Sequence, residues 1–159
     1  MKLLLFFISI FVLLTTGCND SKQIPNLSFE LEQDEKKIYE QLKDRFDESV
    51  LLNVDPISIA KLYIYSNYHN EYDVAYTLYT QREGHVAWSN EDNQMIPERD
   101  RGSKEQMIAN FRNIENGEFY KQSDHEGYIE YEIETGKKSY FQMIKDENNI
   151  WKVSFMPLQ

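Results

Sequence analysis

The sequence predicts an α+β fold in which helical segments come first and a run of antiparallel strands comes last. Two observations indicate this class. Apolar residues recur every three or four positions up to about residue 116, and after Gly117 they recur at every second position. The chain of 159 residues is also 41% hydrophobic and 14% aromatic, which is enough to bury the core of one domain.

The first two helices are predicted from their apolar stripes and their start signals. Residues 30–46 carry one modest stripe among many charges, which is typical of a helix with one buried face. Asp55 and Pro56 favour the start of a second helix, since Asp55 can cap free amides and Pro56 loses no hydrogen bond at the first position. This helix should run to about Tyr68. It is apolar around most of its circumference, so we expect it to be covered on more than one side.

Two more helices are expected before the strands. A short one at 72–79 follows a polar break in the pattern. Residues 81–102 are polar and contain glycine and proline, so we expect a long loop there, either a mobile lid, a binding edge or a stretch without order. Ser103 and Gln106 have the spacing of a capping box, which indicates the start of the last helix.

The strands are predicted from the alternation of apolar and polar side chains. It is found in the segments 119–122, 129–134, 140–144 and 150–156, with short turns between them. This pattern predicts an antiparallel meander that is polar on one side.

The N-terminus has the pattern of an export signal. Lys2 is followed by an almost unbroken apolar stretch at 3–14, which is too short to span a membrane. The segment ending in Thr16, Gly17 and Cys18 resembles the lipobox of bacterial lipoproteins. The resemblance implies cleavage before Cys18 and a diacylglycerol on its thiol. The alternative is an ordinary secretory signal with an incidental cysteine.

The predicted organisation has three parts: a signal peptide at 1–17, a lipidated tether at 18–29 and one domain at 30–159. The expected location is the extracytoplasmic face of a membrane, held by lipid on Cys18, and the composition favours a Gram-positive source. Loss of Lys2 with the signal peptide changes the formal charge from −10 to −11. An acidic chain of this kind is repelled by phosphate backbones, so nucleic acid is not an expected partner.

Three segments carry a resemblance to the NTF2-like (SnoaL-like) superfamily. They are Pro56–Tyr63, the stretch Asn70–Tyr76 and the closing Ile150–Val153, and the similarity extends over residues 55–155. The resemblance implies a cone, in which a curved antiparallel sheet wraps around the long helix and encloses a pocket. The helix at 30–46 is an addition to that pattern.

Within such a cone, several aromatic side chains could line a pocket that supplies hydroxyl donors. The alternative is that they only fill the core. The candidates are Tyr63, Tyr76, Tyr79, Trp88, Tyr131, Tyr140 and Trp151.

No catalytic, cofactor or metal site is expected. His69, His85 and His125 fall in a helix break, a loop and a turn. The three glutamates that alternate through 129–134 are read as the solvated face of a strand. No ligand spacing typical of a metal site occurs.

The leading functional hypothesis is a membrane-anchored lipoprotein whose domain binds a small hydrophobic ligand or an envelope protein without catalysis. The alternative is a SnoaL-like isomerase or dehydratase acting on a small hydrophobic substrate, with Asp73 or a pocket tyrosine as acid and base. A third possibility is a dimerisation module that uses the open sheet face, which the glutamates at 130–134 disfavour.

Overall fold

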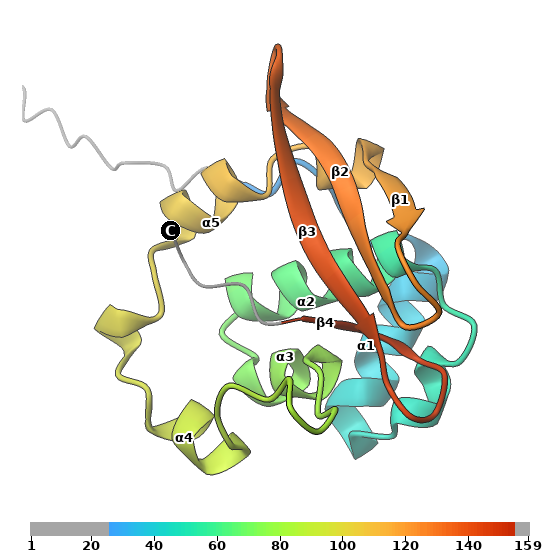
Figure 1. Ribbon diagram of the computed structural model, residues 1–159. Helices are drawn as coiled ribbons and strands as arrows, with labels where there is room; N and C mark the ends of the chain where they lie inside the picture. Colours follow the sequence, from blue (N-terminus) through green and yellow to red (C-terminus); the bar gives the residue numbers. More distant parts are fainter. Residues whose placement is uncertain (1–25, 155–159) are drawn as a thin grey trace, which may run out of the picture.

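The structure is a computed structural model that describes residues 26–154. It confirms the α+β class, with five α-helices and one four-stranded antiparallel sheet in the described part of the chain (Figure 1). The elements are α1 (Gln33–Arg45), η1 (Glu48–Leu51), α2 (Pro56–Tyr68), α3 (Tyr72–Leu78), α4 (Asn90–Met95), η2 (Glu98–Asp100), α5 (Lys104–Asn110), η3 (Ile114–Asn116), β1 (Glu118–Lys121), β2 (Glu126–Glu134), β3 (Lys137–Lys145) and β4 (Trp151–Val153).

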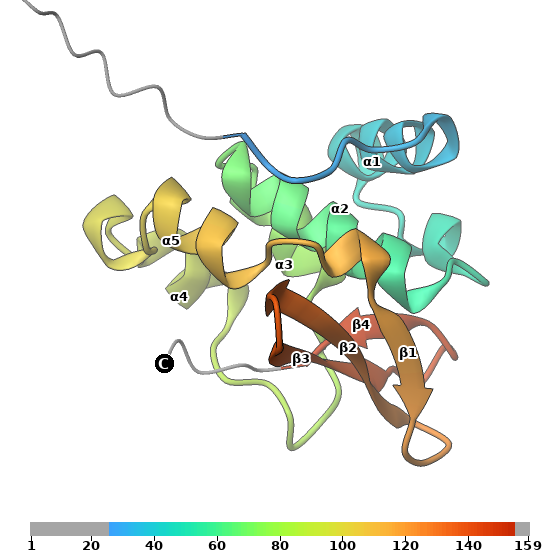
Figure 2. The same ribbon diagram turned by 90° about the horizontal axis from the view of Figure 1, so that it is seen from above.

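The elements form three layers, which are separated most clearly in Figure 2. The sheet is one outer layer. Helix α2 lies in the middle and contacts β1, β4, α3 and α5, and α1 packs on the far side against α2 and α3. Helix α2 is therefore covered on more than one side, as its all-round apolar sequence predicts. The additional N-terminal helix is an integral layer, because Tyr39 and Leu42 from α1 belong to the core.

The helix starts follow the local signals in the sequence. The Asp55 carboxylate accepts hydrogen bonds from the amides of Ile57 and Ser58, at 2.9 and 3.0 Å. Ser103 and Gln106 form the reciprocal pair of a capping box at the start of α5. Both predicted starts are confirmed.

The loop prediction for residues 81–102 is only partly correct. Helix α4 and the short turn η2 occupy much of its second half. A capping box explains the start of α4, because Ser89 and Asp92 bond each other's backbone amides. Helix α4 has six residues and no regular apolar stripe, so periodicity gives no sign of it.

The sheet is a simple meander with the order β1-β2-β3-β4, and each pair is antiparallel. Thr135 and Gly136 turn between β2 and β3, and Gly136 has a φ of +79°, which favours glycine. The β2–β3 hairpin extends past the helices (Figure 1). After α3, Tyr79 makes a parallel bridge to Val153 and so extends the edge next to β4.

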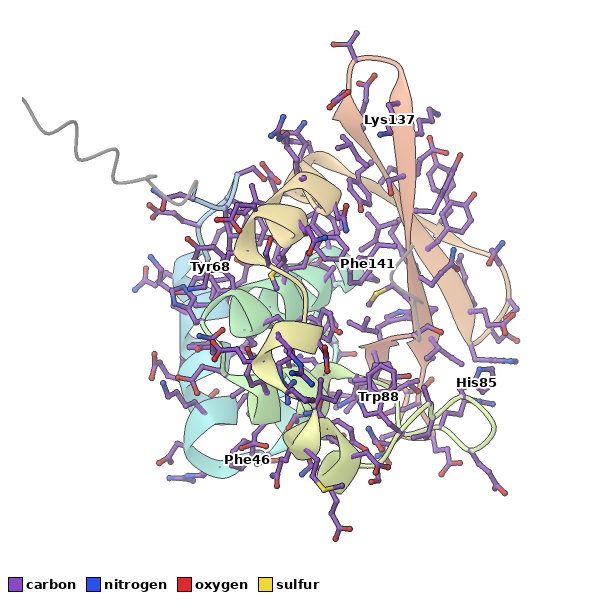
Figure 3. The ribbon with its side chains drawn as sticks, turned by 90° about the vertical axis from the view of Figure 1, so that its left-hand side faces the viewer. Phe46, Tyr68, His85, Trp88, Lys137 and Phe141 are labelled. Atoms are coloured by element: carbon purple, nitrogen blue, oxygen red, sulfur yellow. The ribbon has the colours of Figure 1, made fainter. Side chains whose placement is uncertain are left out.

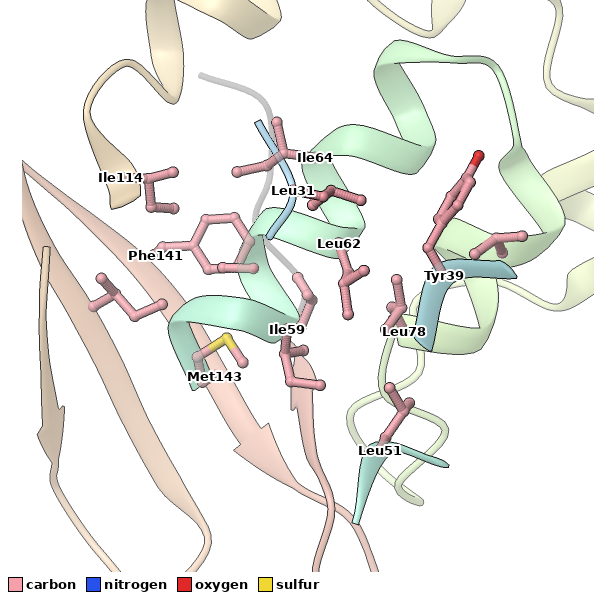
Figure 4. Close-up of a cluster of buried hydrophobic side chains, with 14 of the residues drawn as sticks. Leu31, Tyr39, Leu51, Ile59, Leu62, Ile64, Leu78, Ile114, Phe141 and Met143 are labelled. Carbon is pink, nitrogen blue, oxygen red and sulfur yellow. The ribbon is translucent and has the colours of Figure 1, made fainter. Parts of the chain in front are cut away.

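One face of the sheet packs on the helices, and the core lies between them (Figure 4). Ile129, Phe141, Met143 and Val153 contribute from the strands. The helices, with the segment just before α1, contribute aliphatic side chains, which are Leu31, Leu42, Leu51, Ile59, Leu62, Ile64, Leu78 and Ile114.

The predicted signal peptide, Cys18 and most of the predicted tether lie outside the described residues, as does the predicted end of the last strand at Phe155. Within residues 26–154, no helix is long and apolar enough to cross a membrane.

Candidate functional site

Two of the predicted pocket tyrosines belong to the packed interior between sheet and helices. Tyr131 is buried, and its hydroxyl donates a hydrogen bond of 2.8 Å to the carbonyl oxygen of Asn110. The ring of Tyr63 stands edge-on to Phe141, with ring centres 6.2 Å apart. Phe111 contacts the same Phe141 ring from another direction, at 5.6 Å. These rings fill the space between α2 and the sheet.

Three other candidates gather where α3 meets the following loop. Tyr79 and Trp88 stack with ring centres 5.1 Å apart and planes at 13°, and Tyr76 lies 6.3 Å from Tyr79. The Tyr76 hydroxyl bonds the side chain of Gln81 and the carbonyl of Trp88, at 2.9 and 3.2 Å. The structure therefore brings these three residues together, with Trp88 contributed by the loop that also carries His85 (Figure 3).

The remaining two candidates lie elsewhere. Trp151 packs edge-on against Phe119 at 4.9 Å, near the end of the sheet. Tyr140 is 51% exposed and faces away from the helices, so it does not join the candidates in the interior. The reason is the register of β3, in which Phe141 points into the core and its neighbour must therefore point outward.

Two depressions on the described surface are lined by residues other than the predicted tyrosines, and Trp151 alone of the candidates borders one of them. One has a volume of about 320 Å³ and is lined by charged residues of α1 and the turn that follows. The other has about 240 Å³ and lies beside Trp151 and Lys145. Both are open to solvent.

The acid and base candidates are also dispersed. Asp73 is exposed on α3, where it accepts a hydrogen bond of 3.2 Å from the Gln94 amide. The His69 ring packs against Tyr65 at the end of α2, with the ring planes tilted by 44°, and partial burial lowers the pKa of His69. His85 lies in the loop after α3 and His125 in the turn before β2. No carboxylate and imidazole pair is formed by these residues.

Of the charged side chains in residues 26–154, three are buried, and each has an oppositely charged partner. Glu35 on α1 and Lys61 on α2 form an ion pair at 2.6 Å. Lys152, only 2% exposed, bonds the carbonyl of Thr77 at 2.5 Å and the carboxylate of Glu48 at 2.9 Å. Burial lowers the pKa of Lys152. Residues 26–154 contain no group of three or more His, Cys, Asp or Glu side chains able to hold a metal ion.

The face of the sheet opposite the helices carries an aromatic strip that sequence reasoning missed. Tyr120 on β1, Tyr128 on β2 and Tyr140 on β3 lie side by side across three strands. The Tyr120 and Tyr128 rings are stacked at 5.4 Å with planes at 21°, and Tyr128 meets Tyr140 at 5.5 Å with planes at 75°. Tyr120 and Tyr140 are 38% and 51% exposed.

Charged and polar side chains flank this strip on the same face. The Tyr120 hydroxyl donates a hydrogen bond of 2.8 Å to Glu118, and this bond raises the pKa of Tyr120. Lys138 forms an ion pair with Glu130. We call this surface the tyrosine face and define it by Glu118, Tyr120, Tyr128, Glu130, Glu132, Lys138, Tyr140 and Gln142. The sequence of 118–130 indicates part of this face, because Tyr120 and Tyr128 are an even number of positions from the glutamates expected outside and so lie on the same side of their strands.

Removal of two buried tyrosine hydroxyls should have opposite effects on stability. Within the described part of the chain no group completes a hydrogen bond to the buried Tyr79 hydroxyl, and the Ala87 amide only lies near it, whereas the Tyr131 hydroxyl bonds the carbonyl of Asn110. Tyr79→Phe is expected to raise the free energy of unfolding by up to about 1 kcal/mol, and Tyr131→Phe to lower it by about 1 kcal/mol. Urea unfolding of both variants measures this. Equal losses in the two would show that Tyr79 has a partner.

Alkaline pH should reveal two tyrosines that ionise late. Burial raises the pKa of Tyr39 and of Tyr63 to about 12 from an ordinary 10.0. The folded protein then holds protons that the unfolded chain has released, so stability should fall as the pH rises from about 10.5 to 12. Below about pH 10.5 the lowered pKa of Lys152 has the opposite effect on stability, because there the unfolded chain binds a proton more tightly than the folded protein does. Absorbance at 295 nm should show a late step that Tyr63→Phe reduces, and a single midpoint near pH 10 would contradict the assignment.

Comparisons of the chain with protein-family models, with curated proteins and with solved structures found no match.

Proposed function

We propose that the protein is an extracytoplasmic lipoprotein, anchored through Cys18, whose domain binds an envelope protein through the tyrosine face and performs no catalysis. The tyrosine face is the observation that carries the proposal. A cluster of exposed aromatic residues on a rigid sheet is unusual for a surface exposed only to water, and tyrosine is enriched at the centres of protein interfaces.

The arrangement of the rings supports protein binding. Each ring of the strip contacts the next one, so the side chains are held in place before a partner arrives. Binding then loses little rotational freedom, which favours affinity. The hydroxyl groups and carboxylates beside the rings can accept the hydrogen bonds that fix the orientation of a partner.

The interior gives less support to a small-ligand function or to the enzyme alternative. Tyr63 packs on Phe141 and the Tyr131 hydroxyl bonds Asn110, and the two depressions described above lie elsewhere on the surface. An acid and base pair inside the cone would need a carboxylate or imidazole there, and Asp73 is exposed. We therefore favour the outer face over the interior as the functional surface.

We also propose that the domain is a member of the NTF2-like superfamily. Its support is the order of the elements, in which a long helix and a short one precede a meander, and the position of α2 against the sheet. The four described strands form a smaller sheet than a closed cone would need.

Anchoring is tested by metabolic labelling with an alkyne palmitate in the native host. Cys18 is the single cysteine of the chain, so Cys18→Ala removes the only thiol that could carry the label. We expect wild type to be labelled and to sediment with membranes, because two acyl chains give stable attachment. The variant should lose both properties. An unlabelled wild type released into the medium would contradict the anchor.

Partner binding is tested by photo-crosslinking in intact cells. A benzoylphenylalanine at position 140 places the reactive group on the tyrosine face, and one at Gln41 places it on an exposed part of α1 as a matched control. We expect a discrete protein adduct from position 140 and none from position 41. Adducts of the same mass from both positions, or from neither, would contradict the proposed surface.

A further inference from the structure

The tyrosine face is acidic, and its charges restrict what can bind there. It carries Glu118, Glu130 and Glu132 against a single cation, Lys138, which already pairs with Glu130. The net charge of the face is therefore −2 on a chain whose formal charge is −10. Phosphate groups and anionic lipid surfaces would be repelled from it.

A second copy of the same chain fits this face poorly. In a symmetric dimer each face would meet its own copy, so acidic groups would be brought against acidic groups. Like charges placed opposite one another in an interface cost free energy and disfavour the pairing. The face is thus better suited to a different partner than to self-association.

The tyrosine rings add a preference for cations. A guanidinium or ammonium group is small enough to lie over the part of a ring that its neighbour leaves uncovered and to pair at the same time with an adjacent carboxylate. Tyr120 offers both groups at one place, since its hydroxyl bonds the carboxylate of Glu118. Tyr140 similarly lies opposite Glu130 in the register of β2 and β3.

A flat sugar platform would need ring faces that are open to solvent. Here Tyr120 and Tyr128 stack face to face, and Tyr128 and Tyr140 meet at a steep angle, so the rings cover part of one another. Hydroxyl groups and ring edges then make up much of what a partner meets. This arrangement favours a polypeptide over a glycan.

We infer that the occupant of the tyrosine face is an arginine- or lysine-rich surface of an envelope protein; the inference rests on the proposed function and specifies the chemistry of its partner. The carboxylates of Glu118 and Glu130 pair with the partner's cations. Tyr120 and Tyr140 supply the aromatic contacts.

The test uses the full chain in a nonionic detergent and a fluorescein-labelled peptide of six Arg-Gly repeats, with binding followed by fluorescence anisotropy. The variant Glu118→Gln/Glu130→Gln removes two charges from the face and retains the side-chain size. The control Glu40→Gln/Asp44→Asn removes two charges from exposed positions of α1, so both variants have the same net charge. Circular dichroism melting checks that each variant is folded.

We expect wild type to bind the peptide and the face variant to bind it about tenfold more weakly, which corresponds to roughly 1.4 kcal/mol. The control should lose less than about twofold, since its charges lie far from the bound peptide. Tyr140→Ala should also weaken binding, and it leaves every charge in place.

Three results would overturn the inference. They are no binding of the Arg-Gly peptide by wild type, equal losses in the face variant and the control, or tighter binding of a Glu-Gly peptide of the same length. If position 140 still crosslinks to a protein in cells, the proposed function stands and only the basic partner is excluded. If the crosslink is also absent, both the proposed binding function and the basic partner are contradicted.

Discussion

Replacing Lys61 with methionine is expected to lower the free energy of unfolding by about 3–5 kcal/mol. Lys61 and Glu35 are both 6% exposed and form an ion pair of 2.6 Å between α1 and α2. The variant leaves the Glu35 carboxylate buried without its cation, which costs far more than the pair itself contributes. The hydrogen bonds that Glu35 still accepts, from the Ser58 hydroxyl at 2.8 Å and the Glu32 amide at 2.7 Å, cannot neutralise that charge.

The matched control is the double variant Glu35→Leu/Lys61→Met, which removes both charges and fills the same volume. Buried ion pairs are often replaced by apolar residues at little cost, so the double variant should recover most of the loss. It will not recover all of it, because Glu35 also accepts a hydrogen bond of 2.7 Å from the Glu32 amide at the start of α1. Guanidinium unfolding followed by circular dichroism measures all three proteins. A single variant as stable as wild type would mean that water reaches Glu35.

The sequence predicts the two helices that carry this ion pair but not the ion pair itself. The helices that carry Glu35 and Lys61 were predicted from local signals, which act over four residues or fewer. The two residues are 26 positions apart, and their contact depends on how α1 crosses α2. Nothing in the amphipathic pattern distinguishes these two charged residues from their neighbours, which remain in water.

In the strands, too, the local pattern predicts some features, and other features depend on how the strands pair. In β2 the apolar and polar residues alternate strictly, so the prediction that Ile129 and Tyr131 face inward is confirmed. In β3 the adjacent residues Tyr140 and Phe141 are both large and aromatic, and the pattern around them is mixed, because Gln142 favours an exposed Tyr140 whereas Ile144 on the same face favours a buried one. The register with β2 decides it, and the sequence does not determine that register.

Because the sequence does not determine which side of the sheet Tyr140 faces, it does not predict the tyrosine face. An inward Tyr140 suggested a pocket, whereas an outward Tyr140 completes a strip with Tyr120 and Tyr128. The pairing of β1 with β2, which places Tyr120 opposite Tyr128, is likewise a tertiary fact. The number of tyrosines can therefore be read from the sequence, but the surface on which three of them gather cannot.

Phe141→Ala is expected to lower the free energy of unfolding by about 3–5 kcal/mol, the other large effect in this domain. Phe141 is fully buried, and its ring meets Tyr63 of α2 at 6.2 Å and Phe111 at 5.6 Å. Alanine would leave a cavity where the sheet packs on the helices, and it would also remove both edge-to-face contacts, which contribute beyond the buried area.

The adjacent residue provides the control, because Tyr140→Ala alters the same strand on its exposed side. It should cost less than about 1 kcal/mol, since the lost contact with Tyr128 is at the surface. Comparable losses at the two positions would mean that the register of β3 is wrong, and the tyrosine face would then lose its third ring. A loss below about 1 kcal/mol for Phe141→Ala would instead indicate an interior loose enough to admit a ligand. That outcome would return the function to the space between α2 and the sheet, so this one pair of substitutions decides which side of the sheet can bind a partner.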